Sequence, residues 1–174
     1  QKAGLNVVGV IPIGLFGQPA ALDRIETFSQ GNGLWMLDDA AQSFGATLSE
    51  NVVGTFGSAT ATSFFPAKPL GCYGDGGALF TNDDQLAAIA RSARVHGQGA
   101  DKYENERLGM TARLDTMQAA VLLAKLGIFD EELTLRQKAA DRYADKLAGC
   151  GVIIPELSAA ATSSWAQYVI RLPG

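Results

Sequence analysis

The sequence predicts an α/β fold built around a mostly parallel sheet. An apolar run at residues 7–11 reads as a buried strand, a helical pattern follows it, and a second apolar strand occupies residues 34–37. This strand, helix, strand order is typical of a parallel crossover. The chain has 174 residues, 47% of them hydrophobic and 18% charged, which is enough to bury the core of one domain and argues against disorder.

The first half of the chain supplies three predicted strands and one helix. Gln18-Pro19 opens a helix that runs through Ser29, because proline is tolerated in a first helical turn, and Gly31-Asn32-Gly33 ends it. The strand at residues 34–37 closes on Asp38-Asp39. Residues 59–65, rich in Thr and Phe, form the third predicted strand.

The second half is predicted to be mainly helical. A strand at residues 77–81 precedes a helix capped by Asn82-Asp83-Asp84 and reaching about Val95. Asp115 is expected to cap a long helical region made of residues 117–126 and 129–147. Residues 152–154 and 167–171 are predicted to be the first strands of another unit.

Composition excludes several classes of function. The 14 Lys and Arg against 18 Asp and Glu give a formal charge of −4, which argues against a nucleic-acid binder that relies on bulk charge. The sequence has no run of 18 apolar residues, so a membrane span is not expected. Cys72 and Cys150 belong to no C-x-x-C pair, so we expect no metal site, no disulfide and a reduced, cytoplasmic setting.

Lys68 is the strongest candidate for chemistry. It follows two aromatic residues, Phe64 and Phe65, is flanked by Pro66 and Pro69, and precedes a glycine-rich run from Gly71 to Gly77. Taken alone, such a lysine is usually an exposed charge. If this environment desolvates the amine, its pKa falls and the neutral amine can attack a carbonyl, which is the chemistry of an enzyme that uses pyridoxal phosphate.

Other polar residues at strand ends are consistent with that cofactor. In open α/β sheets, ligands gather at the carboxyl ends of strands, where Asp38, Asp39 and Ser63 are predicted to lie. An aspartate could hold the proton on the pyridine nitrogen, and the serine could bind the phosphate. Because a strand alternates sides, only one of the two aspartates should face the site, and periodicity does not say which. Both could instead cap the following turn.

Four motifs together give a resemblance to a known family. They are Asp38–Ala46, Ser63–Gly71, Tyr73–Gly77 and Arg94–Gly97. In this order they resemble the DegT/DnrJ/EryC1/StrS sugar aminotransferases, most of all the branch that acts on the 3-keto group of nucleotide-linked N-acetylated sugars. The resemblance implies the large domain of a fold type I pyridoxal phosphate enzyme, which has three αβα layers around a mostly parallel sheet, followed by the start of a small C-terminal domain.

The resemblance also implies residue roles. Lys68 would bind the cofactor covalently and move the proton between substrate and cofactor carbons. Asp39 rather than Asp38 would pair with the pyridine nitrogen, Gln42 would lie near the phenolic oxygen, and Ser63 would bind the phosphate. Thr111 would approach the phosphate of a neighbouring subunit, and His96 and Arg113 would face the substrate. The implied partners are a nucleotide keto-sugar, an amino donor expected to be glutamate, and a second copy of the chain in a homodimer.

The chain departs from the family in three ways. Gly14 stands where members usually carry His or Asp, and Thr111 stands where they usually carry Asn. The opening part of the large domain, with its phosphate loop, has no counterpart here. We therefore expect a truncated central part: residues 1–127 from the large domain, 128–150 as a connecting helix, and 151–174 from the small domain.

Two alternatives to a transaminase remain open. One is a truncated homologue that folds and associates without turnover. The other is a sugar dehydratase of the same family, which Lys68 argues against because those relatives carry histidine at that position.

Overall fold

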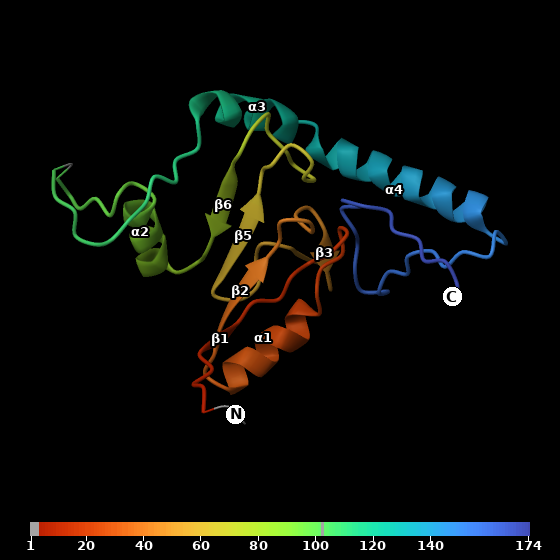
Figure 1. Cartoon of the computed structure of the whole chain (residues 1–174), viewed down its shortest axis with the longest axis horizontal. Coiled ribbons are helices and arrows are strands. Elements are labelled where there is room, and N and C mark those ends of the chain that lie inside the picture. The colour runs from red at the N-terminus through yellow and green to blue at the C-terminus, as the bar shows by residue number, and fades with distance from the viewer. Residues whose placement is uncertain (1–3, 102) are drawn as a thin grey trace.

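A four-stranded sheet in the order β1-β2-β5-β6 forms the centre of the protein in the computed structural model, which describes residues 4–101 and 103–174 (Figure 1). The first three strands are parallel and β6 is antiparallel to β5, as predicted for a mostly parallel sheet. The strands are β1 (Gly9–Val10), β2 (Trp35–Asp39), β5 (Ala59–Ser63) and β6 (Gly77–Phe80).

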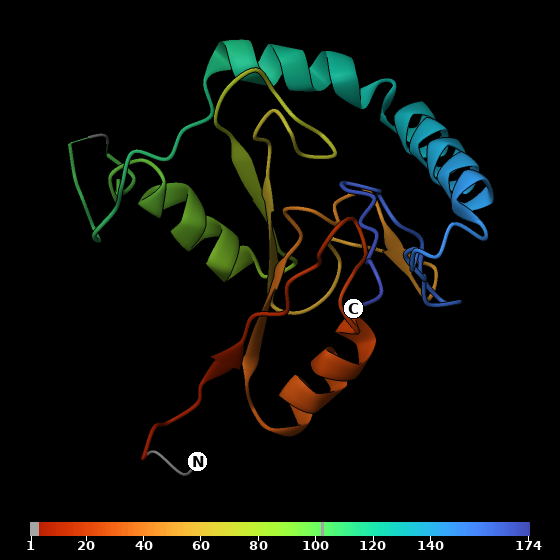
Figure 2. The same ribbon diagram turned by 45° about the vertical axis from the view of Figure 1, so that its right-hand side comes forward.

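Helices lie on both faces of this sheet. Figure 2 shows α1 (Leu22–Gly31) on one side of the strands and α2 (Asp84–Ala93) on the other. The predicted cap of α2 forms, since Asp83 Oδ1 accepts hydrogen bonds from the N–H groups of Gln85 and Leu86 at 2.8 and 3.1 Å. The layers therefore match the predicted αβα arrangement.

Two further helices follow each other across the top of the sheet. α3 (Thr116–Leu126) lies over the end of the sheet to which β2 and β5 point, and α4 (Phe129–Leu147) continues from it (Figure 1). Asp115 occupies the N-cap position of α3 as predicted, but its side chain makes no capping hydrogen bond. The carboxyl ends of β2 and β5 are thus covered by α3 and the loops beneath it.

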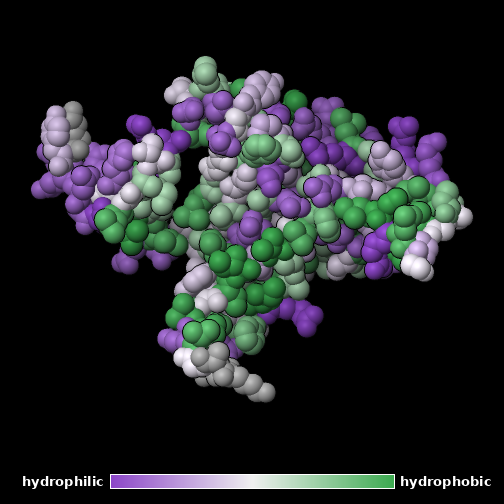
Figure 3. Space-filling model, in the orientation of Figure 1, coloured by the Kyte–Doolittle hydropathy of each residue, from purple (hydrophilic) through white to green (hydrophobic). Residues whose placement is uncertain are grey.

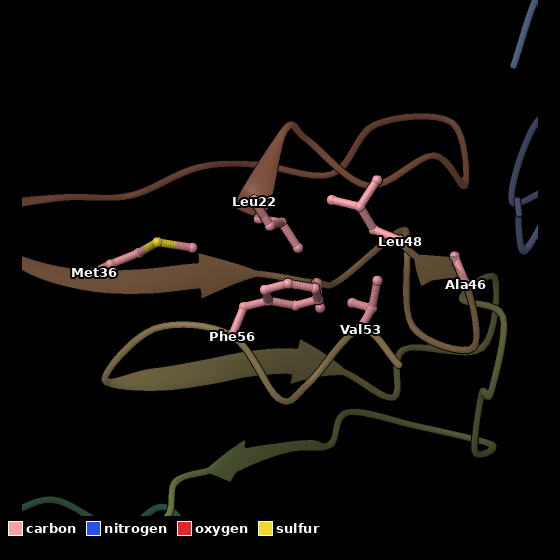
Figure 4. Packing of buried hydrophobic residues seen from close by; sticks show 7 residues of the cluster. Leu22, Met36, Ala46, Leu48, Val53 and Phe56 are labelled. Carbon is pink, nitrogen blue, oxygen red and sulfur yellow. The ribbon is translucent and has the colours of Figure 1, made fainter. Parts of the chain in front are cut away.

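Two apolar clusters hold these elements together. The first joins α1 to β2 and the loops that follow it (Figure 4). Its buried members are Leu22, Met36, Ala40, Ala46, Leu48, Val53 and Phe56. The second lies under α3 and the start of α4, and its buried members are Phe64, Leu70, Cys72, Leu122 and Phe129. Burying a side chain such as Leu22 stabilises the fold by about 1.5–3 kcal/mol.

A short hairpin was not predicted. β3 (Thr47–Leu48) and β4 (Asn51–Val52) pair in antiparallel fashion through a two-residue turn. Both turn residues, Ser49 and Glu50, have positive φ, at 50° and 67°. Two-residue turns of this kind are normally recognised by Asn-Gly or Asp-Gly, so this sequence carries no signal for the hairpin.

The predicted strands at residues 152–154 and 167–171 are wrong. These segments meet only through one antiparallel bridge, between Ile153 and Arg171. A lone two-stranded ribbon is marginal without a third strand or a helix against it, which explains why no regular strand forms. The C-terminal segment instead packs back onto the sheet domain, where the Ser164 N–H donates to Gly17 O at 3.0 Å and the Thr162 N–H donates to Thr47 O at 3.0 Å.

Within residues 4–101 and 103–174, no helix combines the length and apolar character that crossing a membrane requires.

Candidate functional site

Asp39 and Ser63 lie on the same face of the sheet at its carboxyl edge. Asp39 ends β2 and is paired in register with Ala61 of β5, two residues before Ser63. Because side chains alternate along a strand, Asp39, Ala61 and Ser63 point to one side. Both polar residues are half-buried, and Asp39 Oδ1 accepts a hydrogen bond from the Ala41 N–H at 3.0 Å. A carboxylate and a hydroxyl therefore share one edge of one face.

Asp38 points to the opposite side of the sheet. It is paired in register with Thr60, and both residues are fully buried. Neither carboxylate oxygen has a hydrogen-bond partner among the described residues. Burial, with a smaller contribution from the charge of Asp39, raises the pKa of Asp38 from 3.8 to about 6. Of the two aspartates, only Asp39 shares a face with Ser63, and its pairing with a cofactor stays a prediction.

Lys68 lies in the loop that follows β5 directly. The Phe65 N–H donates to Ser63 Oγ at 3.2 Å, and the Lys68 N–H donates to Phe65 O at 2.8 Å, so a short chain of bonds joins the serine to the lysine. Lys68 is half-buried. Complete desolvation of its amine stays a prediction.

Gln42 lies in the turn after β2, close in sequence to Asp39. Its Oε1 accepts a hydrogen bond from the Phe16 N–H at 2.9 Å, and its backbone carbonyl accepts one from Ser164 Oγ at 2.8 Å. These bonds tie the turn to the loop at residues 14–18 and to the C-terminal segment. Among the described residues, the Gln42 side-chain NH2 group has no acceptor, so it is available to donate to a ligand.

The remaining predicted residues lie on a separate segment. Thr111 Oγ1 and His96 Nδ1 approach to 3.4 Å, and the His96 N–H donates to Met110 O at 3.1 Å. Both side chains and that of Arg113 are exposed. Residues 94–101 and 103–113 project past α2, whereas the Lys68 loop, residues 64–76, lies under α3 (Figures 1 and 2). Asp39 and Ser63 thus share one face of the sheet, and Lys68 lies in the loop directly after Ser63. His96 and Thr111 lie beside each other on the second segment, and Leu114, which follows Arg113, packs against Phe64 and Gly76 at the two ends of that loop.

The sheet face that carries Asp39 is apolar and exposed. Ile13 is paired in register with Asp39, and Trp35 and Leu79 lie on the same face of their strands. Their exposed fractions are 52%, 45% and 44%, which is high for large apolar side chains. Figure 3 shows hydrophobic residues gathered over the strands in the centre of the molecule. Large exposed apolar surfaces are often sites of protein–protein or ligand interaction.

The chemistry of these groups fits pyridoxal phosphate. The cofactor presents a ring nitrogen, a phosphate and an aldehyde, and the site offers a carboxylate, a hydroxyl and an amine on neighbouring positions of two strands and one loop. No group of three or more metal-ligating side chains occurs in the described part of the chain.

Sequence reasoning missed two residues that contact the Lys68 loop. Gln118 and Lys125 of α3 hydrogen-bond to its backbone, and they lie about 50 positions further along the chain. Their only signal in the sequence is that positions 118, 122 and 125 share one face of a helix, which is no more than amphipathic helices show.

Comparison with known proteins identifies the relatives of this chain. Residues 6–174 match the profile of the DegT/DnrJ/EryC1/StrS aminotransferase family. A UDP-2-acetamido-2-deoxy-3-oxo-D-glucuronate aminotransferase of Pseudomonas aeruginosa is 47% identical over 94% of this chain and 45% of its own. A UDP-N-acetyl-3-dehydro-alpha-D-glucosamine 3-aminotransferase of Acidithiobacillus ferrooxidans is 37% identical over 94% of this chain and 44% of its own.

A solved structure agrees with these relatives. The crystal structure of a DegT DnrJ EryC1 StrS aminotransferase from Brucella abortus superposes with a TM-score of 0.94 at 48% identity, over 99% of this chain and 46% of that one. This confirms the predicted α/β aminotransferase fold. The chain spans less than half the length of the curated relatives that it matches.

Proposed function

The chain belongs to the DegT/DnrJ/EryC1/StrS aminotransferase family, and we propose that it performs pyridoxal phosphate-dependent transamination of a nucleotide-linked keto-sugar. The observation that carries the proposal is the shared position of Asp39 and Ser63 on one face of the sheet, directly before the Lys68 loop. Sugar transamination is favoured over other uses of this cofactor because relatives at 47% and 37% identity are named for UDP-linked 3-keto sugars.

Each residue has a distinct task in this proposal. When bound, pyridoxal phosphate supplies an aldehyde that carries the amino group and a ring that withdraws electrons from the substrate carbon. The Asp39 carboxylate would hold a proton at the ring nitrogen, and the Ser63 hydroxyl would donate a hydrogen bond to the phosphate. Lys68 would hold the cofactor through its Nζ, and its amine would be the group that moves a proton at the reacting carbon. The NH2 group of Gln42, which has no acceptor among the described residues, would donate a hydrogen bond to the phenolic oxygen.

The segment that carries His96, Thr111 and Arg113 is proposed to serve a second copy of the chain. Among the described residues, no hydrogen bond joins these three side chains to the Lys68 loop, and all three side chains are exposed. A homodimer in which this segment completes the partner's site accounts for both facts. Light scattering after gel filtration tests the dimer, and a single-chain mass at micromolar concentration would contradict it.

The domain division is also a proposal. Residues 1–127 hold the sheet and α1 to α3, residues 128–150 are almost entirely α4, and residues 151–174 have no regular element of their own. The last segment is proposed to belong to the family's small domain.

One observation favours a second candidate function. The large apolar side chains on the sheet face beside Asp39 are exposed. A homologue that binds partners without turnover would show the same feature. The dehydratase alternative receives no such support, because residue 68 is lysine.

Absorbance and turnover separate these candidates. The protein is incubated with pyridoxal phosphate, and visible absorbance reports binding. Glutamate and a UDP-linked 3-keto sugar are then added, and formation of 2-oxoglutarate is measured. The proposed function predicts both signals. Binding without 2-oxoglutarate would favour the second candidate, and absence of binding would contradict the proposal.

A further inference from the structure

The Lys68 loop, defined here as residues 64–76, is closed at its base by its own backbone. The Phe64 N–H donates to Gly76 O at 2.8 Å, and the Cys72 N–H donates to Phe64 O at 2.8 Å. The Cys72 thiol is buried and adds a contact to Phe64 O at 3.0 Å. These bonds fix where the loop leaves and rejoins the sheet.

Beyond the base, the loop is held by α3. The Tyr73 N–H donates to Gln118 Oε1 at 2.8 Å, and Lys125 Nζ donates to Gly71 O at 2.7 Å. Between these two residues, Leu122 is buried in the same cluster as Leu70 and Cys72. Positions 118, 122 and 125 are four and three residues apart, so one face of α3 supplies all three contacts.

The bond from Lys125 is made at Gly71, where the backbone of the loop packs closely against itself. Gly71 is buried, and a Cβ at this position would lie 2.6 Å from Pro66 O and 2.8 Å from Phe65 O. The loop therefore folds tightly on itself around Lys68. Among the described residues, Lys125 is the only donor to Gly71 O. Loss of Lys125 would leave the part-buried Gly71 carbonyl without a partner among the described residues, and an unpaired carbonyl shielded from water is costly.

We propose that Gln118 and Lys125 are positioning residues that hold the Lys68 loop in the conformation that presents Lys68 to the cofactor. We call these two contacts, Gln118 with Tyr73 and Lys125 with Gly71, the clamp. The role of the clamp in presenting Lys68 rests on the proposed function, whereas the contacts themselves belong to the protein without cofactor. Lys125 is half-buried and donates a charge-assisted bond, which is among the stronger kinds. Neither side chain is proposed to touch substrate or cofactor.

The first test needs no cofactor. Amide hydrogen exchange is measured by mass spectrometry on the protein without pyridoxal phosphate. The variants are Lys125→Met, Gln118→Leu and Gln118→Glu. The last is a rescue variant, because it keeps an acceptor for the Tyr73 N–H. Lys138→Met is the matched control, because Lys138 is an exposed lysine on α4. Exchange in residues 64–76 is expected to rise roughly tenfold or more in the first two variants. Residues 84–93 are expected to be unchanged, as is the control.

The second test joins the clamp to the cofactor. Uptake of pyridoxal phosphate is followed by visible absorbance. Lys125→Met and Gln118→Leu are expected to bind it at least about fivefold more weakly than the wild type. Gln118→Glu and Lys138→Met are expected to bind it as the wild type does. Unchanged exchange in residues 64–76, or an equal rise throughout the protein, would overturn the clamp. The two proposals can fail separately. If exchange in Lys125→Met and Gln118→Leu rises only in the loop but the wild-type protein takes up no pyridoxal phosphate, the clamp is supported and the proposed function is refuted.

Discussion

Replacing Asp38 by asparagine is expected to stabilise the protein in a pH-dependent way. Asp38 is fully buried beside Thr60, and both of its carboxylate oxygens have no hydrogen-bond partner among the described residues. Burial, and to a lesser extent the charge of Asp39, raises the pKa of Asp38 from 3.8 to about 6. The folded state therefore opposes ionisation of this group.

The sign and size of the effect follow from linkage. The raised pKa means that the folded state binds more protons than the unfolded state between pH 3.8 and about 6. The free energy of unfolding therefore falls as pH rises through this interval, and it levels off above about pH 7. A shift of this size corresponds to about 3 kcal/mol at most. The asparagine introduced by Asp38→Asn cannot ionise, so the variant escapes this loss.

Urea unfolding followed by circular dichroism measures the effect at pH 5 and at pH 8. The stability of Asp38→Asn relative to wild type should improve by about 1.4 kcal/mol from pH 5 to pH 8, because Asp38 of the folded wild type is ionised only at the higher pH. Asp145→Asn, on the exposed surface of α4, is the control and should show no such trend. A difference between Asp38→Asn and wild type that is the same at both pH values would refute the reasoning.

Three other predictions follow from the geometry. Ser63→Ala should weaken binding of pyridoxal phosphate about tenfold in an absorbance titration, because a hydrogen bond to the phosphate is lost, while Ser63→Thr keeps it; equal affinities in all three proteins would remove Ser63 from the site. Asp39→Asn should still bind the cofactor but lose at least about 100-fold in transamination rate, since an amide cannot hold the ring proton; a rate near wild type would exclude the assigned role. Gly97→Ala should lower the free energy of unfolding by more than about 2 kcal/mol, because φ at this position is +76° and the new Cβ would overlap Arg107 O. The control Gly33→Ala, at φ +64° with open space around it, should cost only about 1 kcal/mol. Similar losses for both variants in urea unfolding would contradict the predicted clash.

The elements that the sequence predicts well are those with strong local signals. The Asp83 cap and the periodicity of residues 84–93 are sufficient to place α2, and the apolar runs at 34–37 and 59–65 are sufficient to place β2 and β5. The positions of polar residues at strand ends also predict that one of the two aspartates, Ser63 and the Lys68 loop lie at the carboxyl edge of the sheet, and the structure places Asp39, Ser63 and the loop there.

Long-range relations are less accessible to such reasoning. Alternation along β2 shows that Asp38 and Asp39 face opposite ways, but only pairing with β5 shows which of them shares a face with Ser63. The contact of Lys125 with Gly71 spans 54 positions and has no local signature. At residues 152–154 and 167–171 the local signal for strands is misleading, because no third strand packs there to stabilise the pairing.

The most direct measurement of the central claim is reduction of the protein with borohydride after incubation with pyridoxal phosphate, followed by peptide mass spectrometry. A pyridoxyl group is expected on the peptide that carries Lys68, and Lys68→Arg should carry none. A wild-type protein in which Lys68 stays unmodified, or is modified no more than exposed lysines such as Lys138, would contradict the assignment of this site.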